Sequence, residues 1–225
     1  MSMAVVTTDP DRRHWTVAEL REIPDDRNRY EIIDGELFVT PSPSWKHQDI
    51  AGHLHVLIYS YLKAQRLGNV LLAPADVELA DDTVVEPDLF VVPLVEGKAP
   101  ESWAAVGRLL LVIEILSPST ARVDRRVKRT RYQGEGVPEY WIVDGDAQVV
   151  ERWRPEDERP EIISEQLEWR PEPSIHHSSL IYLRCLPARS HTSGWRPDVI
   201  AKRRIRKDAP FWFESYCELT CPAAA

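Results

Sequence analysis

One run of residues, RLLLVIEILS at positions 108–117, constrains the fold more than any other feature of the sequence. A strand that is almost continuously apolar must be covered on both faces, which is typical of the centre of a sheet with helices on each side. Glu114 is the only charged residue after Arg108 in this run. Burial of a carboxylate is costly unless it is paired or binds a cation. Glu114 is therefore a candidate functional residue as well as part of a core strand.

Two local signals upstream predict a hairpin and a helix. The segment 29–40 has strand-forming residues on both sides of Asp34-Gly35, a dipeptide typical of a two-residue β-hairpin turn. After the breaker PSPS at 41–44, residues 46–66 place apolar side chains at three-to-four-residue spacing, as one face of a helix does. Ser44 is a plausible N-cap for this helix.

The rest of the domain reads as strands interrupted by one charged helix. The segments 69–79, 83–92 and 108–117 are rich in β-branched or aliphatic residues and predict three consecutive strands. Residues 123–133 predict a helix that stops at Gly134-x-Gly136. The segment 139–144 predicts a buried strand, and 148–154 and 161–170 predict a final pair of strands. This order predicts a single α/β or α+β sheet domain over residues 14–174.

The two ends of the chain differ from this domain. Residues 1–13 are expected to be a flexible N-terminus. Residues 175–225 carry a net charge of +4, against −12 for residues 1–174, and contain all three cysteines, Cys185, Cys217 and Cys221. They show no sustained helix or strand period, so we expect a poorly ordered or non-native tail.

Composition excludes several classes of protein. No stretch approaches the ~20 apolar residues that a membrane helix needs, and the N-terminal residues lack a signal-peptide pattern, so we expect a cytoplasmic protein without membrane contacts. A domain without cysteine has no disulfide framework. The acidic body argues against tight non-specific binding to nucleic acid, because that affinity comes mainly from neutralised phosphates. Any contact with nucleic acid requires a local basic patch.

Two carboxylates on neighbouring predicted strands suggest a metal site. Asp88 lies in the strand 83–92, and Glu114 lies in the next one. Two carboxylates that face one cavity repel each other and raise the pKa of one of them, whereas a hard divalent cation such as Mg²⁺ relieves the repulsion. Lys128, in the charged helix, offers a positive charge. The alternative for Glu114 is a carboxylate that reaches water at a strand end or pairs with an arginine.

Several spaced motifs then occur in the order typical of one family. EPDLFVV (86–92), LLVIEILSPST (110–120), DRRVKRTRY (124–132) and GVPEYWIVD (136–144), with YEIIDGEL (30–37) and SPSWKH (42–47) upstream, closely resemble the Uma-two family of bacterial restriction-endonuclease-like proteins. The resemblance covers roughly residues 14–174. It implies the PD-(D/E)xK nuclease fold, in which helices flank a mixed central sheet and the acids lie on two adjacent strands.

The resemblance also implies roles for individual residues. Asp88 and Glu114 match the two acids of the family, and with the carbonyl of Ile115 they would hold Mg (or Mn). The usual lysine two residues after the second acid is Leu116 in this chain. Lys128 holds the matching position on the following helix, where it would position a water or offset charge in the transition state.

Two upstream residues match the family as well. Glu31 would add an acid to the metal site, and His47 would contact phosphate or assist the water. The alternatives are an exposed strand residue and a histidine that merely begins a helix.

The charged helix also provides the best candidate for a grip on the phosphate backbone. Its arginines surround Lys128, and Asp124 lies four residues before that lysine, where a helix brings the two side chains together. The alternative is a solvated helix with internal ion pairs. The candidate nucleic-acid-binding residues are Arg122, Arg125, Arg126 and Arg129.

Together these features predict a magnesium-dependent endonuclease that hydrolyses phosphodiester bonds in nucleic acid, with DNA as the expected substrate. One alternative is a non-catalytic nucleic-acid-binding or interaction module derived from a nuclease fold. Another is an enzyme that acts on a different phosphate ester. Many nucleases of this fold act as dimers, so a homodimer is one possibility. The sequence does not identify a surface that would form the interface.

Overall fold

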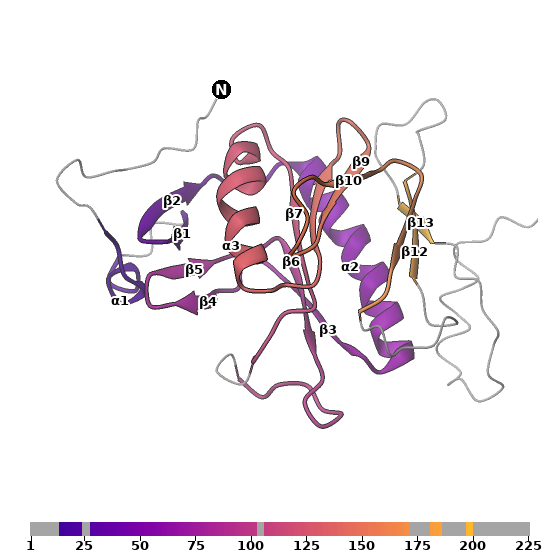
Figure 1. Cartoon of the computed structure of the whole chain (residues 1–225), viewed down its shortest axis with the longest axis horizontal. Helices are drawn as coiled ribbons and strands as arrows, with labels where there is room; N and C mark the ends of the chain where they lie inside the picture. Colours follow the sequence, from indigo (N-terminus) through magenta and orange to yellow (C-terminus); the bar gives the residue numbers. More distant parts are fainter. Residues whose placement is uncertain (1–13, 24–27, 103–105, 172–180, 186–196, 200–225) are drawn as a thin grey trace, which may run out of the picture.

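The computed structural model describes residues 14–23, 28–102, 106–171, 181–185 and 197–199 (Figure 1). The expectation for residues 1–13 lies outside this part of the chain. Within it, no helix is both long and apolar enough to cross a membrane.

A six-stranded mixed sheet forms the centre of the molecule. Its strand order is β10-β9-β8-β7-β6-β3. All five residues of β7 are buried, and β7 pairs antiparallel with β6 and parallel with β8. The apolar run around Glu114 therefore forms an interior strand, as the sequence predicts. The strands are β3 (Gly68–Leu72), β6 (Leu89–Pro93), β7 (Leu111–Ile115), β8 (Tyr140–Asp144), β9 (Val149–Trp153) and β10 (Glu161–Ile163).

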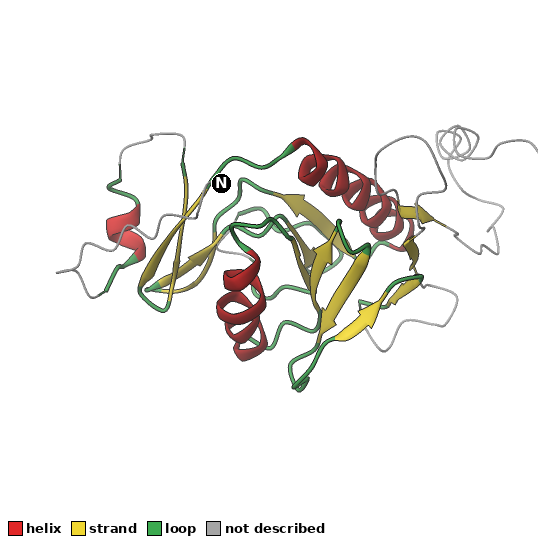
Figure 2. Cartoon of the chain, turned by 90° about the horizontal axis from the view of Figure 1, so that it is seen from above, coloured by secondary structure: helices red, strands yellow, loops and turns green. Residues whose placement is uncertain are grey.

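Helices cover both faces of this sheet (Figure 2). Helix α2 (Trp45–Gln65) begins at Ser44, whose side chain accepts a hydrogen bond from the backbone N–H of His47, so the predicted N-cap is confirmed. Its apolar face packs with Leu111, Ile113 and Ile115 in one core cluster. Val112 belongs to the cluster on the other face, with Tyr132 of α3. Side chains alternate along a strand, so Glu114 lies on the same face as Val112.

A smaller sheet, with strand order β2-β1-β5-β4, lies beside the central one. Its predicted hairpin is confirmed: Asp34 and Gly35 have φ angles of 52° and 81°, the positive values that a tight hairpin turn needs. The short helix α1 (Val17–Leu20) packs against this sheet. The strands are β1 (Arg29–Ile33), β2 (Glu36–Thr40), β4 (Val77–Ala80) and β5 (Thr83–Val85).

The predictions of single strands over 69–79 and 83–92 are wrong. Each segment breaks into two strands that belong to different sheets: β3 and β4 in the first, β5 and β6 in the second. The breaks contain Pro74 and Pro87, which have no N–H to donate to a sheet ladder. As a result the chain passes between the sheets twice, and Asp88 lies at the second crossing.

The prediction of one strand over 161–170 is also wrong. The segment divides into β10 and β11 (Gln166–Trp169), and β11 pairs with β12 (Ile181–Cys185) in a third sheet that also contains β13 (Pro197–Val199). Two strands are thus described within residues 175–225. The remainder of the predicted tail lies outside the described residues.

The charged helix differs from a regular α-helix. Residues Val123–Lys128 form a π-helical segment, η2, which continues as α3 (Arg129–Gly134). Gly136 has a φ of 68°, consistent with the predicted stop. Asp124 and Lys128 are both buried, at 1% exposure each. The alternative of a fully solvated helix is therefore wrong for these two positions.

Candidate active site

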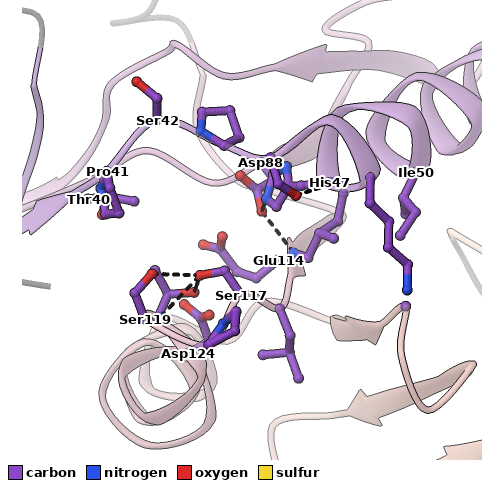
Figure 3. Close-up of a pocket in the computed structure, with 18 of the residues that line it drawn as sticks. Thr40, Pro41, Ser42, His47, Ile50, Asp88, Glu114, Ser117, Ser119 and Asp124 are labelled. Carbon is purple, nitrogen blue, oxygen red and sulfur yellow. Dashed lines mark hydrogen bonds and ion pairs between the residues drawn. The ribbon is translucent and has the colours of Figure 1, made fainter. Parts of the chain in front are cut away.

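A cavity of about 210 Å³ opens where the two sheets meet. Its walls come from the start of β1, the end of β2 and the segment that leads into α2, the first turns of α2, and the crossing at Asp88. The end of β7 with the loop that follows it, residue 124 of η2 and the turn 145–146 complete them. The carboxylates of Asp88, Glu114 and Asp124 gather around it (Figure 3). The two acids chosen from the sequence thus face one cavity, with Ile115 also on its wall.

Asp88 is held by three hydrogen-bond donors. Its Oδ2 accepts from the backbone N–H of Ile115 at 2.8 Å and lies 2.9 Å from Nε2 of His47. Nη1 of Arg29 lies 3.4 Å from Oδ1. Burial raises the pKa of Asp88, but the hydrogen bond from His47 and the charges of His47 and Arg29 outweigh it and lower the pKa below its usual value. Asp88 is therefore an anion at neutral pH.

Glu114 is the acid of this pair whose pKa is raised. Its side chain is 2% exposed, and Oε1 lies 2.9 Å from Nζ of Lys128. Burial raises the pKa of Glu114 well above its usual value, Lys128 opposes this rise, and the negative charge of Asp88 adds to it. The repulsion expected between the two acids thus raises the pKa of Glu114 and not that of Asp88.

Lys128 is buried among the carboxylates of the site. Its Nζ is 2.8 Å from Oε1 of Glu31, 2.9 Å from Oε1 of Glu114 and 3.9 Å from Oδ1 of Asp124. Burial lowers the pKa of Lys128, but the three carboxylates raise it well above its usual value, so the ammonium stays charged. The described residues that line the cavity do not include Lys128 or Glu31.

The two upstream candidates are both brought to the site. Glu31 is 1% exposed, so the alternative of an exposed strand residue is wrong. Its Oε1 accepts from the backbone N–H of Glu86 at 2.8 Å as well as from Lys128. His47 does begin a helix, and its ring also reaches Asp88, while its Nδ1 is buried without a hydrogen-bond partner.

Three residues at the site were not singled out from the sequence. Asp124 has a buried Oδ1 without a hydrogen-bond partner, and burial, opposed by Lys128, raises its pKa to about 6. Arg29 lies between Glu86 and Asp88, with Nε 4.0 Å from Oε2 of Glu86. Of the three, only Asp124 has a signal in the sequence: it lies four residues before Lys128, a spacing that brings two side chains together on a helix. Contacts between distant strands bring Arg29 and Glu86 to the site.

The four arginines proposed to grip nucleic acid divide into two pairs. Arg125 forms an ion pair with Glu151 at 2.6 Å, and the guanidinium of Arg129 lies 4.8 Å from the ring centre of Trp153. Arg122 and Arg126 are exposed. None of the four belongs to the described lining of the cavity, so any grip on nucleic acid lies outside it.

The chemistry of the site fits a hard divalent cation. Within the described residues, no group of three or more His, Cys, Asp or Glu side chains is arranged to hold a metal ion as it stands. Five carboxylates are nevertheless buried around two permanent cations, Arg29 and Lys128, and the Oδ1 of Asp124 has no hydrogen-bond partner. Such an excess of negative charge favours a bound cation, and oxygen donors are the ligands that Mg²⁺ prefers. The carboxylates are Glu31, Glu86, Asp88, Glu114 and Asp124.

The Glu86→Gln variant is expected to be more stable than the wild type at pH 8 by at least about 1 kcal/mol. Burial, only partly offset by Arg29, raises the pKa of Glu86 from 4.5 to about 7. The folded protein thus binds more protons than the unfolded chain between these values, and wild-type stability falls as the pH rises through this window.

Glutamine cannot titrate, so the stability of the variant should change less from pH 4.5 to pH 8. Urea unfolding with a chelator present, over this range, measures the difference. The exposed Glu36, changed to Gln, is the matched control. Parallel pH profiles for wild type and Glu86→Gln would contradict the prediction.

Comparison with known proteins agrees with the fold. The family model for Uma2, described as "Putative restriction endonuclease", matches residues 17–182. A solved structure described as a "putative nuclease belonging to DUF820", from Anabaena variabilis, is 26% identical and superposes with a TM-score of 0.56. That match covers 71% of this chain and 90% of the other. No curated protein matches the chain.

These matches confirm the predicted restriction-endonuclease-like architecture of a mixed sheet flanked by helices. The matched residues include both sheets that enclose the cavity, together with η2 and α3. The chain belongs to the Uma2 family.

Proposed function

We propose that this protein is a metal-dependent endonuclease that hydrolyses phosphodiester bonds in nucleic acid, with DNA as the substrate. The observation that carries the proposal is the pair of buried acids, Asp88 and Glu114, which come from different segments of the chain and face one cavity. Membership of the Uma2 family and the likeness to a protein described as a putative nuclease support the same conclusion.

Asp88, Glu114 and the carbonyl of Ile115 are the groups that would hold the metal. When bound, Mg²⁺ or Mn²⁺ supplies Lewis acidity and a water of lowered pKa. His47 and the backbone N–H of Ile115 fix the orientation of the Asp88 carboxylate. Lys128 and Glu31 are buried next to the cavity. Their ion pair holds the Lys128 ammonium in place, and that ammonium pairs with Glu114.

Hydroxyl groups offer donors for substrate oxygens. Ser117 Oγ lies 2.9 Å from Ser119 Oγ and 3.0 Å from Thr120 Oγ1, and all three residues line the cavity, as does Ser42 on another wall (Figure 3). We propose that these groups contact the phosphate and sugar, and that the exposed Arg122 and Arg126 contact the backbone outside the cavity.

One observation favours the non-catalytic alternative. The ammonium of Lys128 already pairs with Glu31 and Glu114, and no three-ligand metal group exists among the described side chains. In that alternative, the lysine would replace the metal permanently. Binding of a divalent ion therefore separates the two functions.

A combined cleavage and unfolding experiment tests the proposal. The wild type should cleave plasmid or single-stranded DNA with Mg²⁺ or Mn²⁺, and RNA cleavage is measured in parallel. Asp88→Asn should abolish cleavage. Millimolar Mg²⁺ should raise the melting temperature of the wild type more than that of Asp88→Asn, because a ligand that binds only the folded state stabilises it.

Asp88→Asn should also be less stable than the wild type at pH 8 when a chelator is present. A carboxyl whose pKa is lowered in the folded state stabilises the fold above its unfolded pKa, and Asp88 is such a group. Asp34→Asn, in the hairpin turn outside the cavity lining, is the control and should cleave normally. Identical responses of wild type and Asp88→Asn to the metal would exclude Asp88 as a ligand.

A further inference from the structure

Lys128, the cation that the sequence assigns to catalysis, is not among the described residues that line the cavity. Lys128 is covered by carboxylates, and its side chain is 2% exposed. The basic side chains in the described lining are instead Arg29, Lys46 and His47. Lys46 forms a 2.6 Å ion pair with Asp146, and both side chains are substantially exposed. Arg29 is therefore the permanent cation that lies beside the acids and also lines the cavity.

The contacts of Arg29 leave much of its hydrogen-bonding capacity unused. Nη1 is 3.4 Å from Asp88 and Nε is 4.0 Å from Glu86, both longer than the 2.7–2.9 Å typical of charged hydrogen bonds. Nε is buried and has no hydrogen-bond partner. The side chain is 20% exposed, so the guanidinium is held near the acids while part of it remains accessible.

We propose that Arg29 is a catalytic residue that contacts the substrate phosphate, and that Lys128 is a positioning residue for the carboxylates. The proposal rests on the nuclease function proposed above. A guanidinium matches the geometry of two phosphate oxygens, whereas an ammonium is a compact point charge. Arg29 is the first residue of β1, so its side chain reaches the cavity from the smaller sheet, whereas Glu114 reaches it from β7 of the central sheet.

The chemical role of Arg29 is electrostatic. During hydrolysis the water oxygen bonds to phosphorus and the water gives up a proton to solvent. The ester P–O bond to the leaving oxygen breaks, and that oxygen takes up a proton if it leaves as a hydroxyl. Arg29 exchanges no proton; its N–H groups offset the charge on the non-bridging phosphate oxygens.

The competing role is purely structural, with Arg29 serving only as a partner of Asp88. Two variants separate the roles, Arg29→Gln and Arg29→Lys. The matched control is Arg131→Gln, since Arg131 pairs with Asp34 at 2.8 Å outside the cavity lining. Each protein is first tested for cooperative thermal unfolding. Single-turnover cleavage with Mg²⁺ and binding of a short single-stranded DNA with Ca²⁺ are then measured.

Arg29→Gln should lower the cleavage rate by about 10²–10³-fold, as loss of one preorganised donor does. The slope of log Kd against log salt should also fall by about 0.7, the contribution of one phosphate contact in single-stranded DNA. Arg29→Lys should keep the salt slope but lose at least about tenfold in rate, because it lacks the planar fork. Arg131→Gln should match the wild type in both.

An unchanged salt slope in folded Arg29→Gln would overturn the proposal, as would cleavage within about threefold of the wild type. If Arg29→Gln does not unfold cooperatively, Arg29→Lys decides: a wild-type rate overturns the proposal and a tenfold loss supports it. If the wild type cleaves nothing, the proposed nuclease function fails. The binding measurements still decide whether Arg29 meets a phosphate.

Discussion

Replacing Glu114 with glutamine is expected to lower metal-dependent cleavage by at least ~10³-fold, more than the 10–100-fold typical of residues that only orient a metal ligand. The same change should raise the melting temperature of the metal-free protein at pH 8. Burial, which outweighs the opposing charge of Lys128, holds the pKa of Glu114 well above its usual value. A carboxyl with a raised pKa costs stability above its unfolded pKa, and a neutral isostere removes that cost.

Cleavage rates and thermal unfolding with a chelator, at pH 5 and pH 8, measure both effects. The gain in melting temperature should be larger at pH 8, because the cost of the raised pKa grows as the pH rises above the ordinary value of 4.5. Glu165→Gln, in the exposed turn between β10 and β11, is the control. If Glu114→Gln cleaves at the rate of the wild type, Glu114 does not hold the metal. If it is less stable at pH 8, the pairing with Lys128 outweighs the cost of burial.

Replacing Lys128 with alanine is expected to lower the free energy of unfolding by about 3–5 kcal/mol, the usual cost of breaking a buried ion pair by removing one partner. Lys128 is the common partner of Glu31, Glu114 and Asp124. Its removal leaves three buried carboxylates to repel one another. An exposed helix position would instead accept alanine with little effect.

Urea unfolding measures this loss as a shift in the midpoint at constant slope. The triple variant Lys128→Met, Glu31→Gln, Glu114→Gln should recover most of the stability, because it removes the unpaired charges together with the lysine. Arg126→Ala, on the exposed side of the same helix, should stay within about 0.5 kcal/mol of the wild type. A loss below about 1 kcal/mol in Lys128→Ala would mean that the carboxylates are balanced by other groups.

The sequence predicts that Asp88 and Glu114 belong to one site, but it does not predict which of the two carboxyls has the raised pKa. The pattern around Asp88 and Glu114 predicts that one carboxyl has a raised pKa without saying which. The structure decides this through three contacts: His47, Arg29 and the backbone N–H of Ile115 all stabilise Asp88 as an anion. These groups come from three different elements, so their convergence is a property of the folded chain.

The hairpin at Asp34-Gly35, the helix that starts after Ser44 and the apolar strand around Glu114 were determined by the sequence alone. Each rests on a local signal: a turn dipeptide, a capping side chain and a continuous apolar run. The tertiary structure decided where the chain changes sheets, because Pro74 and Pro87 interrupt segments whose composition still favours strands.

The tertiary structure also decided that Lys128 is buried and that Arg29 lines the cavity. Burial and charge pairing depend on residues from distant segments, 97 positions apart for Glu31 and Lys128, and no local pattern contains that information.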